Sequence, residues 1–238
     1  MNQPATRAPL SGLRDYLKQI IYGGNDGIVT TFAIVAGFAG ANADGVAQVG
    51  GLAVLIFGLA NLFADAVSMG LGEFLSSRSA HDLYRARRAD YVRQVTAVPE
   101  TGVKSLSGLL ISKGLAPENA AQVARHLSTA PQLMAEQILY HEHGVQPPEE
   151  DNPGVNGTVT FLSFVLFGSL PLLPYILRGA DSGSLMMSAI ATLTALTALG
   201  LLRWVATGDR LRMAVLETVG VGSVCAGVAY VVGWMVGG

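Results

Sequence analysis

Residues 22–41 read Tyr-Gly-Gly-Asn-Asp-Gly-Ile-Val-Thr-Thr-Phe-Ala-Ile-Val-Ala-Gly-Phe-Ala-Gly-Ala, and this stretch decides the class of fold. It is apolar and about 20 residues long, the length that a helix needs to cross the hydrocarbon core of a bilayer. One acid, Asp26, nevertheless lies near its start. An acid within a membrane span costs about 3 kcal/mol on insertion scales, so Asp26 is a candidate functional residue.

The composition of the whole chain also indicates a membrane protein. Its 238 residues are 50% hydrophobic and only 13% charged, whereas soluble domains carry about 25% charged residues. The formal net charge of −2 gives no electrostatic basis for binding nucleic acid. The single cysteine, Cys225, excludes an intrachain disulfide and a cysteine-based metal cluster.

Five segments are long and apolar enough to be predicted as transmembrane helices. They are residues 20–42, 46–72, 155–177, 183–202 and 212–236. The second is expected to continue as a helix towards Ser79, and Pro171 and Pro174 should kink the third. The predicted fold class is therefore all-α, a polytopic membrane protein with five transmembrane helices.

The segment between the second and third helices differs in kind. Residues 80–153 are predicted to form a cytoplasmic helical insert of three or four short helices, which separates an N-terminal part, residues 1–79, from a C-terminal part, residues 154–238. The apolar residues that could supply a small core for the insert are Leu106, Leu109, Leu110, Val123, Leu127, Leu133 and Ile138.

The basic residues predict the orientation in the membrane. Fourteen of the fifteen Lys and Arg residues lie in the N-terminal segment, in or beside the insert, or in the loop 203–212, and Arg178 is the exception. Because basic residues gather on the cytoplasmic side, we expect a cytoplasmic N-terminus and a cytoplasmic insert. The cluster Arg85-Ala-Arg87-Arg88 is interpreted as an anchor at the membrane surface that contacts anionic lipid.

A polar stripe runs along the second helix. Asn61, Asp65, Met69 and Glu73 follow one another at a spacing of four residues, which places them on one helical face. An amide, a carboxylate, a thioether and a second carboxylate are the groups that a path for a partly dehydrated divalent cation would need. Other roles are open for each residue. Asn61 and Asp65 could hydrogen-bond a neighbouring helix. Met69 could fill the core, and Glu73 could be a charge at the membrane interface.

Asp26 is expected to lie at the depth of this stripe. The first two helices should form an antiparallel hairpin that turns near Asp44, which brings Asp26 level with Asn61 and Asp65. Two carboxylates at one depth repel each other, and either a divalent cation or protons relieve the repulsion. We therefore predict metal–proton exchange with Asp26 and Asp65 as the proton-coupling residues, and the soft ligand Met69 favours Fe²⁺ or another transition metal.

A group of polar residues in the insert is a weaker candidate. In the insert, His141, Glu142 and His143 could form a secondary metal site. Adjacent residues of a helix point to different faces, so a solvated helix end is the favoured interpretation of 141–143.

The fifth predicted helix carries one acid of its own. This acid, Glu217, is expected to pair with Arg210 or Arg212.

Several motifs resemble those of the vacuolar iron transporter family. The two most specific are residues 26–33, Asp-Gly-Ile-Val-Thr-Thr-Phe-Ala, and residues 58–77, Gly-Leu-Ala-Asn-Leu-Phe-Ala-Asp-Ala-Val-Ser-Met-Gly-Leu-Gly-Glu-Phe-Leu-Ser-Ser. Residues 98–100, Val-Pro-Glu, and 227–233, Gly-Val-Ala-Tyr-Val-Val-Gly, match as well. The resemblance covers nearly the whole chain, and the chain looks like a bacterial-type member.

The resemblance implies a transporter rather than an enzyme, and no cofactor. Members of the family move ferrous iron, and often manganese, out of the cytosol by proton antiport. The ion path would lie at the interface of a homodimer, between paired first and second helices. Asp26 and Met69 match path residues of the family, and Asp65 matches an acid of its bacterial members. The expected partners are Fe²⁺ or Mn²⁺, protons, lipid and a second copy, in a bacterial inner membrane.

The insert departs from the family pattern. In plant-type members it is a glutamate-rich platform that collects metal ions, and the matching positions here are Tyr91, Gln94, Gly102 and Ser105. None of these residues is acidic. Of the acids that the resemblance implies, only Glu142 is clearly present, with Glu100 nearby as a second weak candidate. The insert should therefore bind metal weakly and serve mainly as a dimer scaffold.

Two other functions use the same residues. An intramembrane aspartyl protease could use Asp26 and Asp65 as a catalytic dyad, although the Gly-x-Gly-Asp pattern of such enzymes is absent and Met69 would have no role. A metal-sensing membrane scaffold would bind metal without transporting it.

Overall fold

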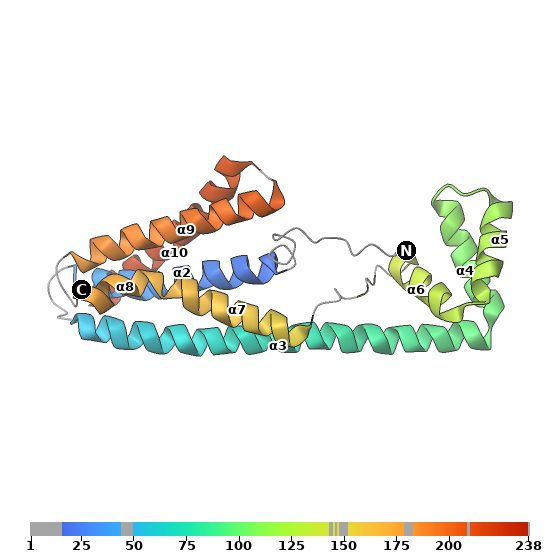
Figure 1. The fold of residues 1–238 in the computed structure, drawn as a ribbon, viewed down its shortest axis with the longest axis horizontal. Coiled ribbons are helices and arrows are strands. Elements are labelled where there is room, and N and C mark those ends of the chain that lie inside the picture. Colours follow the sequence, from blue (N-terminus) through green and yellow to red (C-terminus); the bar gives the residue numbers. More distant parts are fainter. Residues whose placement is uncertain are drawn as a thin grey trace, which may run out of the picture. The chain divides into compact units, whose positions relative to one another are not determined.

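The computed structural model describes residues 16–43, 50–142, 145, 147, 152–178, 183–208 and 210–237. Every regular element within these residues is a helix, so the all-α class is confirmed (Figure 1). The elements are α2 (Leu17–Ala41), α3 (Gly51–Ala97), α4 (Pro99–Ser112), α5 (Pro117–Ser128), α6 (Pro131–Glu142), α7 (Pro153–Gly168), the 3₁₀ turn η1 (Leu170–Leu172), α8 (Leu173–Arg178), α9 (Ser184–Thr207) and α10 (Leu211–Gly237). The turn expected near Asp44 lies outside the described residues.

Four helical segments of the described chain are long and apolar enough to cross a membrane. They are Gly51–Ala97, Pro153–Arg178, Ser184–Thr207 and Leu211–Gly237. The first predicted span, α2, forms a helix of 25 residues but is not among these four, and its first half carries the polar residues Asn25 and Asp26. The count of five spans stays a prediction.

The second helix is much longer than expected. We predicted that it would end near Ser79, but α3 runs for 47 residues to Ala97, so the first part of the predicted insert is a continuation of this helix. No glycine or proline interrupts residues 73–98, and Pro99 then ends the helix because proline cannot continue the hydrogen-bond ladder.

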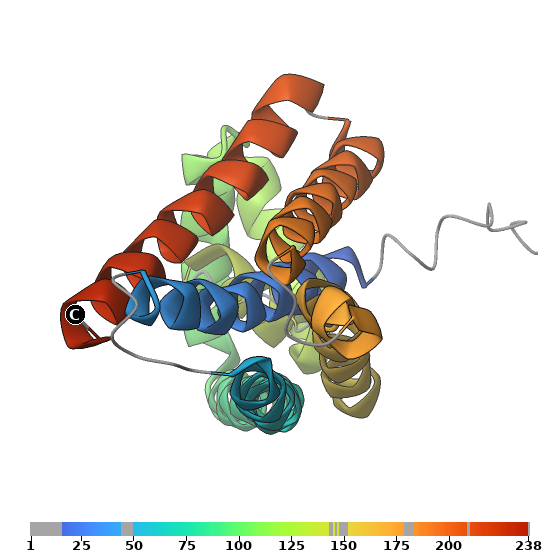
Figure 2. The ribbon, with the colours of Figure 1, turned by 90° about the vertical axis from the view of Figure 1, so that its left-hand side faces the viewer.

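The chain divides into two compact units. The first consists of Met1–Phe74 and Pro153–Gly238, and the second of Leu75–Asn152. In the first unit, α2 packs against α7, α9 and α10, which surround it in Figure 2.

Glycines bring the helices of the first unit into close contact. A Cβ on Gly27 would lie 2.5 Å from the carbonyl oxygen of Phe164 on α7, and a Cβ on Gly233 would lie 1.9 Å from the carbonyl oxygen of Gly37. Helices in lipid associate through such close packing of small residues.

The third span is interrupted at the predicted place. Helix α7 ends at Gly168, the 3₁₀ turn η1 contains Pro171, and α8 resumes with Pro174 in its first turn. Ser188 of α9 is fully buried and donates a hydrogen bond of 2.6 Å to the carbonyl oxygen of Pro171. A side chain of a neighbouring helix thus satisfies a backbone group at the break, as lipid-buried irregular backbone requires.

The second unit has its own small core of residues from α3 to α6. The buried members are Val95, Leu106, Ala124, Met134, Ala135 and Ile138, and Leu109, Leu110 and Leu127 pack against them. The prediction was wrong for Val123 and Leu133, which are exposed and line a hollow of about 260 Å³.

One basic residue of the expected lipid anchor has a protein partner. Arg88 donates a hydrogen bond of 2.7 Å to Glu136 of α6. It therefore links α3 to α6 within the second unit.

Candidate metal path

The polar stripe of α3 lies beside the buried face of this helix. Residues 54, 58, 62, 66 and 70 form the buried face. The stripe residues each follow one of the last four by three positions and are half-buried: Asn61, Asp65, Met69 and Glu73. Met69 also packs against a hydrophobic cluster of the first unit. The stripe is thus neither fully sealed in the core nor fully exposed.

Helix packing brings Asp26 to the level of this stripe. Gly168 of α7 meets both neighbouring helices: a Cβ on it would lie 2.8 Å from the carbonyl oxygen of Gly27 on α2 and 2.6 Å from Leu62 on α3. Asp26 and Asn61 directly precede these two contact residues in the sequence, so they lie at similar heights on their helices.

The half-buried carboxylate of Asp26 lies close enough to that of Asp65 for the two to repel each other. The hydroxyl of Thr30 donates to the backbone carbonyl of Asp26 at 2.8 Å rather than to its side chain. A positive charge or a proton between the two acids would relieve the repulsion.

Asn61 orients one of the two acids. Its Nδ2 donates a hydrogen bond of 2.6 Å to Oδ2 of Asp65, within α3 and not to a neighbouring helix. A carboxylate that accepts from an amide keeps further lone pairs, and the amide keeps its carbonyl oxygen. The pair therefore presents several oxygen acceptors on one side of α3.

Glu73 has a partner that the sequence analysis missed. Gln19 of α2, which is 3% exposed, donates through Nε2 to Oε1 of Glu73 at 3.3 Å. The one signal in the sequence was the spacing of seven residues between Gln19 and Asp26, which places them on one face of the helix.

A groove adjoins the other end of the stripe. It has a volume of about 810 Å³, and Asn61 is its polar lining residue. Its remaining lining residues come from α2, α3 and α10 and are apolar, many of them small: Ala33, Ile34, Gly37, Phe38, Ala41, Phe57, Ala60, Ala64, Ala229, Val232, Gly233, Val236 and Gly237.

The described weaker candidates of the insert have other contacts or positions of their own. Glu142 accepts a hydrogen bond from Ser105, the ring of His141 packs edge-on against Tyr140 with centroids 4.6 Å apart, and Glu100 lies in the first turn of α4. His143 lies outside the described residues. Throughout the described part of the chain, no three His, Cys, Asp or Glu side chains form a group that could hold a metal ion.

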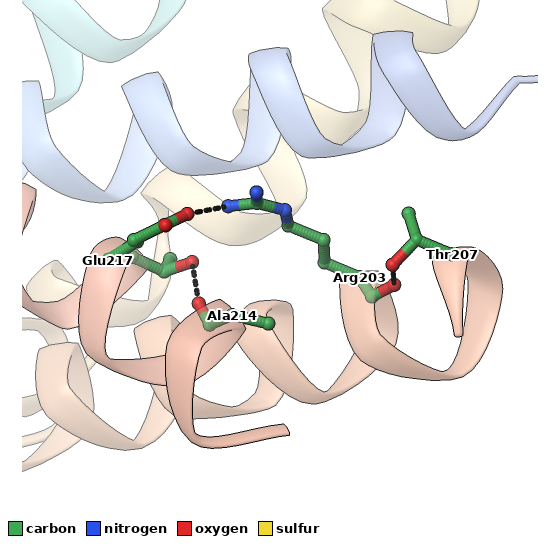
Figure 3. Close-up of polar contacts among 5 residues, drawn as sticks. Arg203, Thr207, Ala214 and Glu217 are labelled. Atoms are coloured by element: carbon green, nitrogen blue, oxygen red, sulfur yellow. Dashed lines mark hydrogen bonds and ion pairs between the residues drawn. The ribbon is translucent and has the colours of Figure 1, made fainter. Parts of the chain in front are cut away.

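Glu217 pairs with a different arginine than expected. Its carboxylate accepts a hydrogen bond of 2.8 Å from Arg203 of α9 (Figure 3), not from Arg210 or Arg212. The side chain of Arg203 extends along the contact between α9 and α10 and so reaches Glu217 from the neighbouring helix.

Comparison with known proteins agrees with the motifs. A family model described as the VIT family matches residues 17–234. The chain is 30% identical over 216 residues to vacuolar iron transporter 2 of Oryza sativa subsp. japonica, covering 91% of this chain and 85% of the relative. It is also 30% identical to vacuolar iron transporter 1 of Arabidopsis thaliana, over 91% and 84% of the two chains. For the vacuolar iron transporter of Plasmodium falciparum the values are 31%, 80% and 71%. The chain therefore belongs to the VIT family.

Proposed function

We propose that this protein exports divalent metal ions from the cytoplasm in exchange for protons, with Fe²⁺ as the main cargo and Mn²⁺ as the second. The observation that carries the proposal is that Asp26 and Asp65 lie at one level and repel each other, with Asn61 bonded to Asp65. Met69 follows one helical turn further along α3. The relatives of the chain are named as iron transporters and not as enzymes, which argues against a protease that uses the same two acids.

The chemistry of exchange follows from the two repelling carboxylates. A divalent cation between Asp26 and Asp65 neutralises both, and its departure restores the repulsion unless protons replace it. Protonation from the far side therefore favours release of the metal, and deprotonation towards the cytoplasm favours its binding. Met69, one turn along α3 from Asp65, offers a soft ligand that suits Fe²⁺ better than Mg²⁺ or Ca²⁺.

The proposed path runs along α3 from Glu73 to Asn61 and then into the apolar groove. In our proposal a second copy of the chain covers the groove, so that α2 and α3 of two protomers line the path. Its small residues suit this role because they let helices approach closely in lipid.

In the proposed topology the protein crosses the membrane five times, with α2 as the first span. The distribution of basic residues supports a cytoplasmic N-terminus and a cytoplasmic insert that acts as a dimer scaffold. We propose a bacterial inner membrane as its location.

Reconstituted vesicles test the proposal. With the purified protein in liposomes, Fe²⁺ added outside should enter faster when the lumen is more acidic than the bath, because outgoing protons drive the exchange. Asp26→Asn should abolish this uptake, because an amide does not take up a proton when the metal leaves.

The matched control is Glu217→Gln, which also neutralises an acid of a predicted span but leaves the stripe intact. It should transport like the wild type. Uptake by Asp26→Asn at the wild-type rate, or uptake that ignores the pH gradient, would refute the proposal.

A further inference from the structure

Two amide oxygens are buried at the end of the first unit where α2 and α7 begin. Gln19 and Asn156 are 3% and 4% exposed, and neither Oε1 of Gln19 nor Oδ1 of Asn156 has a hydrogen-bond partner among the described residues. Buried polar atoms are nearly always satisfied, and exceptions often mark a place for an ion or water. Both side chains therefore need an explanation.

The packing of α2 on α7 places the two amides at the same level. A Cβ on Gly23 would lie 2.6 Å from the carbonyl oxygen of Thr160. Gln19 and Asn156 each lie four residues, one helical turn, before these two contact residues. Since α2 and α7 run in the same direction at this contact, Gln19 and Asn156 lie across it from each other.

Helix α3 adds a carboxylate at this level. A Cβ on Gly157 would lie 3.1 Å from Cβ of Phe74, so the residue after Asn156 touches the residue after Glu73. Glu73 accepts the hydrogen bond from Nε2 of Gln19. The unpartnered amide oxygen of Gln19 is thus held close to a half-buried carboxylate, and Glu73 forms no ion pair among the described residues.

We propose that Glu73, Gln19 and Asn156 bind a divalent cation through oxygen atoms. One carboxylate and two amide carbonyls are hard ligands, which suit Mn²⁺, Fe²⁺ or Mg²⁺ and leave the remaining coordination positions to water. This site contains no sulfur, unlike the neighbouring position of Met69, one helical turn away.

The proposal rests on the proposed function in one respect, because Glu73 is the first residue of the proposed path. A cation would bind oxygen ligands at Glu73 and then meet the thioether of Met69. The first site would accept Mn²⁺ and Fe²⁺ alike, and discrimination between them would fall to the second.

Binding of Mn²⁺ to the full-length protein in detergent tests the site. The background protein for this test is the double variant Asp26→Asn, Met69→Leu, which lacks two ligands of the inner path. The EPR signal of free Mn²⁺ reports how much Mn²⁺ is bound, and the background protein should retain a Mn²⁺ site. Asn156→Leu, which keeps the branched shape of the side chain but offers no oxygen ligand, should weaken it about tenfold or more, the effect of losing one contact to a charged group.

Two further variants sharpen the test. Asn156→Asp adds a charge and should tighten Mn²⁺ binding. Thr158→Ala changes an exposed residue of the same helix, whose hydroxyl bonds the carbonyl oxygen of Gly154, and should change nothing. At one Mn²⁺ concentration, the melting temperature of the background protein should also rise more than that of its Asn156→Leu derivative.

Specific results would overturn the proposal. These are unchanged Mn²⁺ affinity in the folded Asn156→Leu protein, no tightening by Asn156→Asp, or no Mn²⁺ bound to the folded background protein, in which case the amide oxygens hold water only. Absence of Fe²⁺ flux through the wild type in vesicles would refute the proposed transport and leave this binding site standing.

Discussion

The contact between α2 and α7 at Gly27 allows a sharp test of how packing supports the site. Gly27→Ala would place a Cβ 2.5 Å from the carbonyl oxygen of Phe164, whereas ordinary contacts begin at 3.4 Å. The carbonyl oxygen belongs to a helix backbone, and the Cβ has no torsion that could turn it aside. Helix α2 must therefore move away from α7 by about 0.9 Å, the difference between these two distances.

The expected magnitude follows from overpacking. Forcing a methyl group into a filled contact costs about 1–3 kcal/mol. Asp26 directly precedes Gly27 and moves with it, which changes its separation from Asp65. We therefore expect both a lower melting temperature and slower Fe²⁺ uptake by the reconstituted variant.

The control is a glycine without a close contact. Among the described residues, no atom lies within 4 Å of a Cβ built on Gly72 of α3. Gly72→Ala should therefore leave stability unchanged or raise it by up to about 1 kcal/mol, because alanine is the better helix former. Scanning fluorimetry of both variants in one detergent, followed by uptake in vesicles, measures the contrast. If Gly27→Ala matches the wild type in both assays, the packing argument is wrong.

Three further predictions concern the path and its surroundings. Met69→Leu keeps volume and apolarity, so stability should hold while Fe²⁺ uptake falls more than Mn²⁺ uptake; equal transport of both ions would show that Met69 only fills space. Ser188→Ala leaves the buried carbonyl oxygen of Pro171 without its hydrogen-bond donor and should lower the free energy of unfolding by about 1–3 kcal/mol, seen as a lower melting temperature. An unchanged melting temperature would mean that the backbone at the break in the third span needs no hydrogen-bond partner. Ala60→Trp fills the groove proposed to receive a second copy, so light scattering should shift from dimer to monomer, and an intact dimer would place the interface elsewhere.

The sequence predicted features that depend on neighbours along the chain. The helical class follows from apolar runs, and the stripe from Asn61 to Glu73 follows from a spacing of four residues. Pro171 and Pro174 marked the interruption of the third span because proline breaks a helix wherever it packs. The length of α3 was also readable, since residues 73–98 contain no glycine or proline, but the change in charge suggested a boundary that backbone geometry does not require.

Pairings between helices were predicted less well. Glu217 lies within a few residues of Arg210 and Arg212, yet its partner is Arg203 of the preceding helix. Val123 and Leu133 fit a core pattern but are exposed. In both cases the outcome depends on how each helix is rotated about its axis, and apolar periodicity constrains that rotation only coarsely.

The sequence by itself determined the family, the all-helical class and the residues of the stripe, because motifs and helical spacing are local properties of the chain. Only the tertiary structure decided that Gln19 reaches Glu73 and that Asn156 lies level with both. Those residues are far apart in sequence, and they meet because glycines set the register between α2, α3 and α7. Small residues at a spacing of four, such as Gly23 and Gly27, predict close helix packing. They do not say which residues of two helices meet, so the buried amides could be found only once the helices were packed.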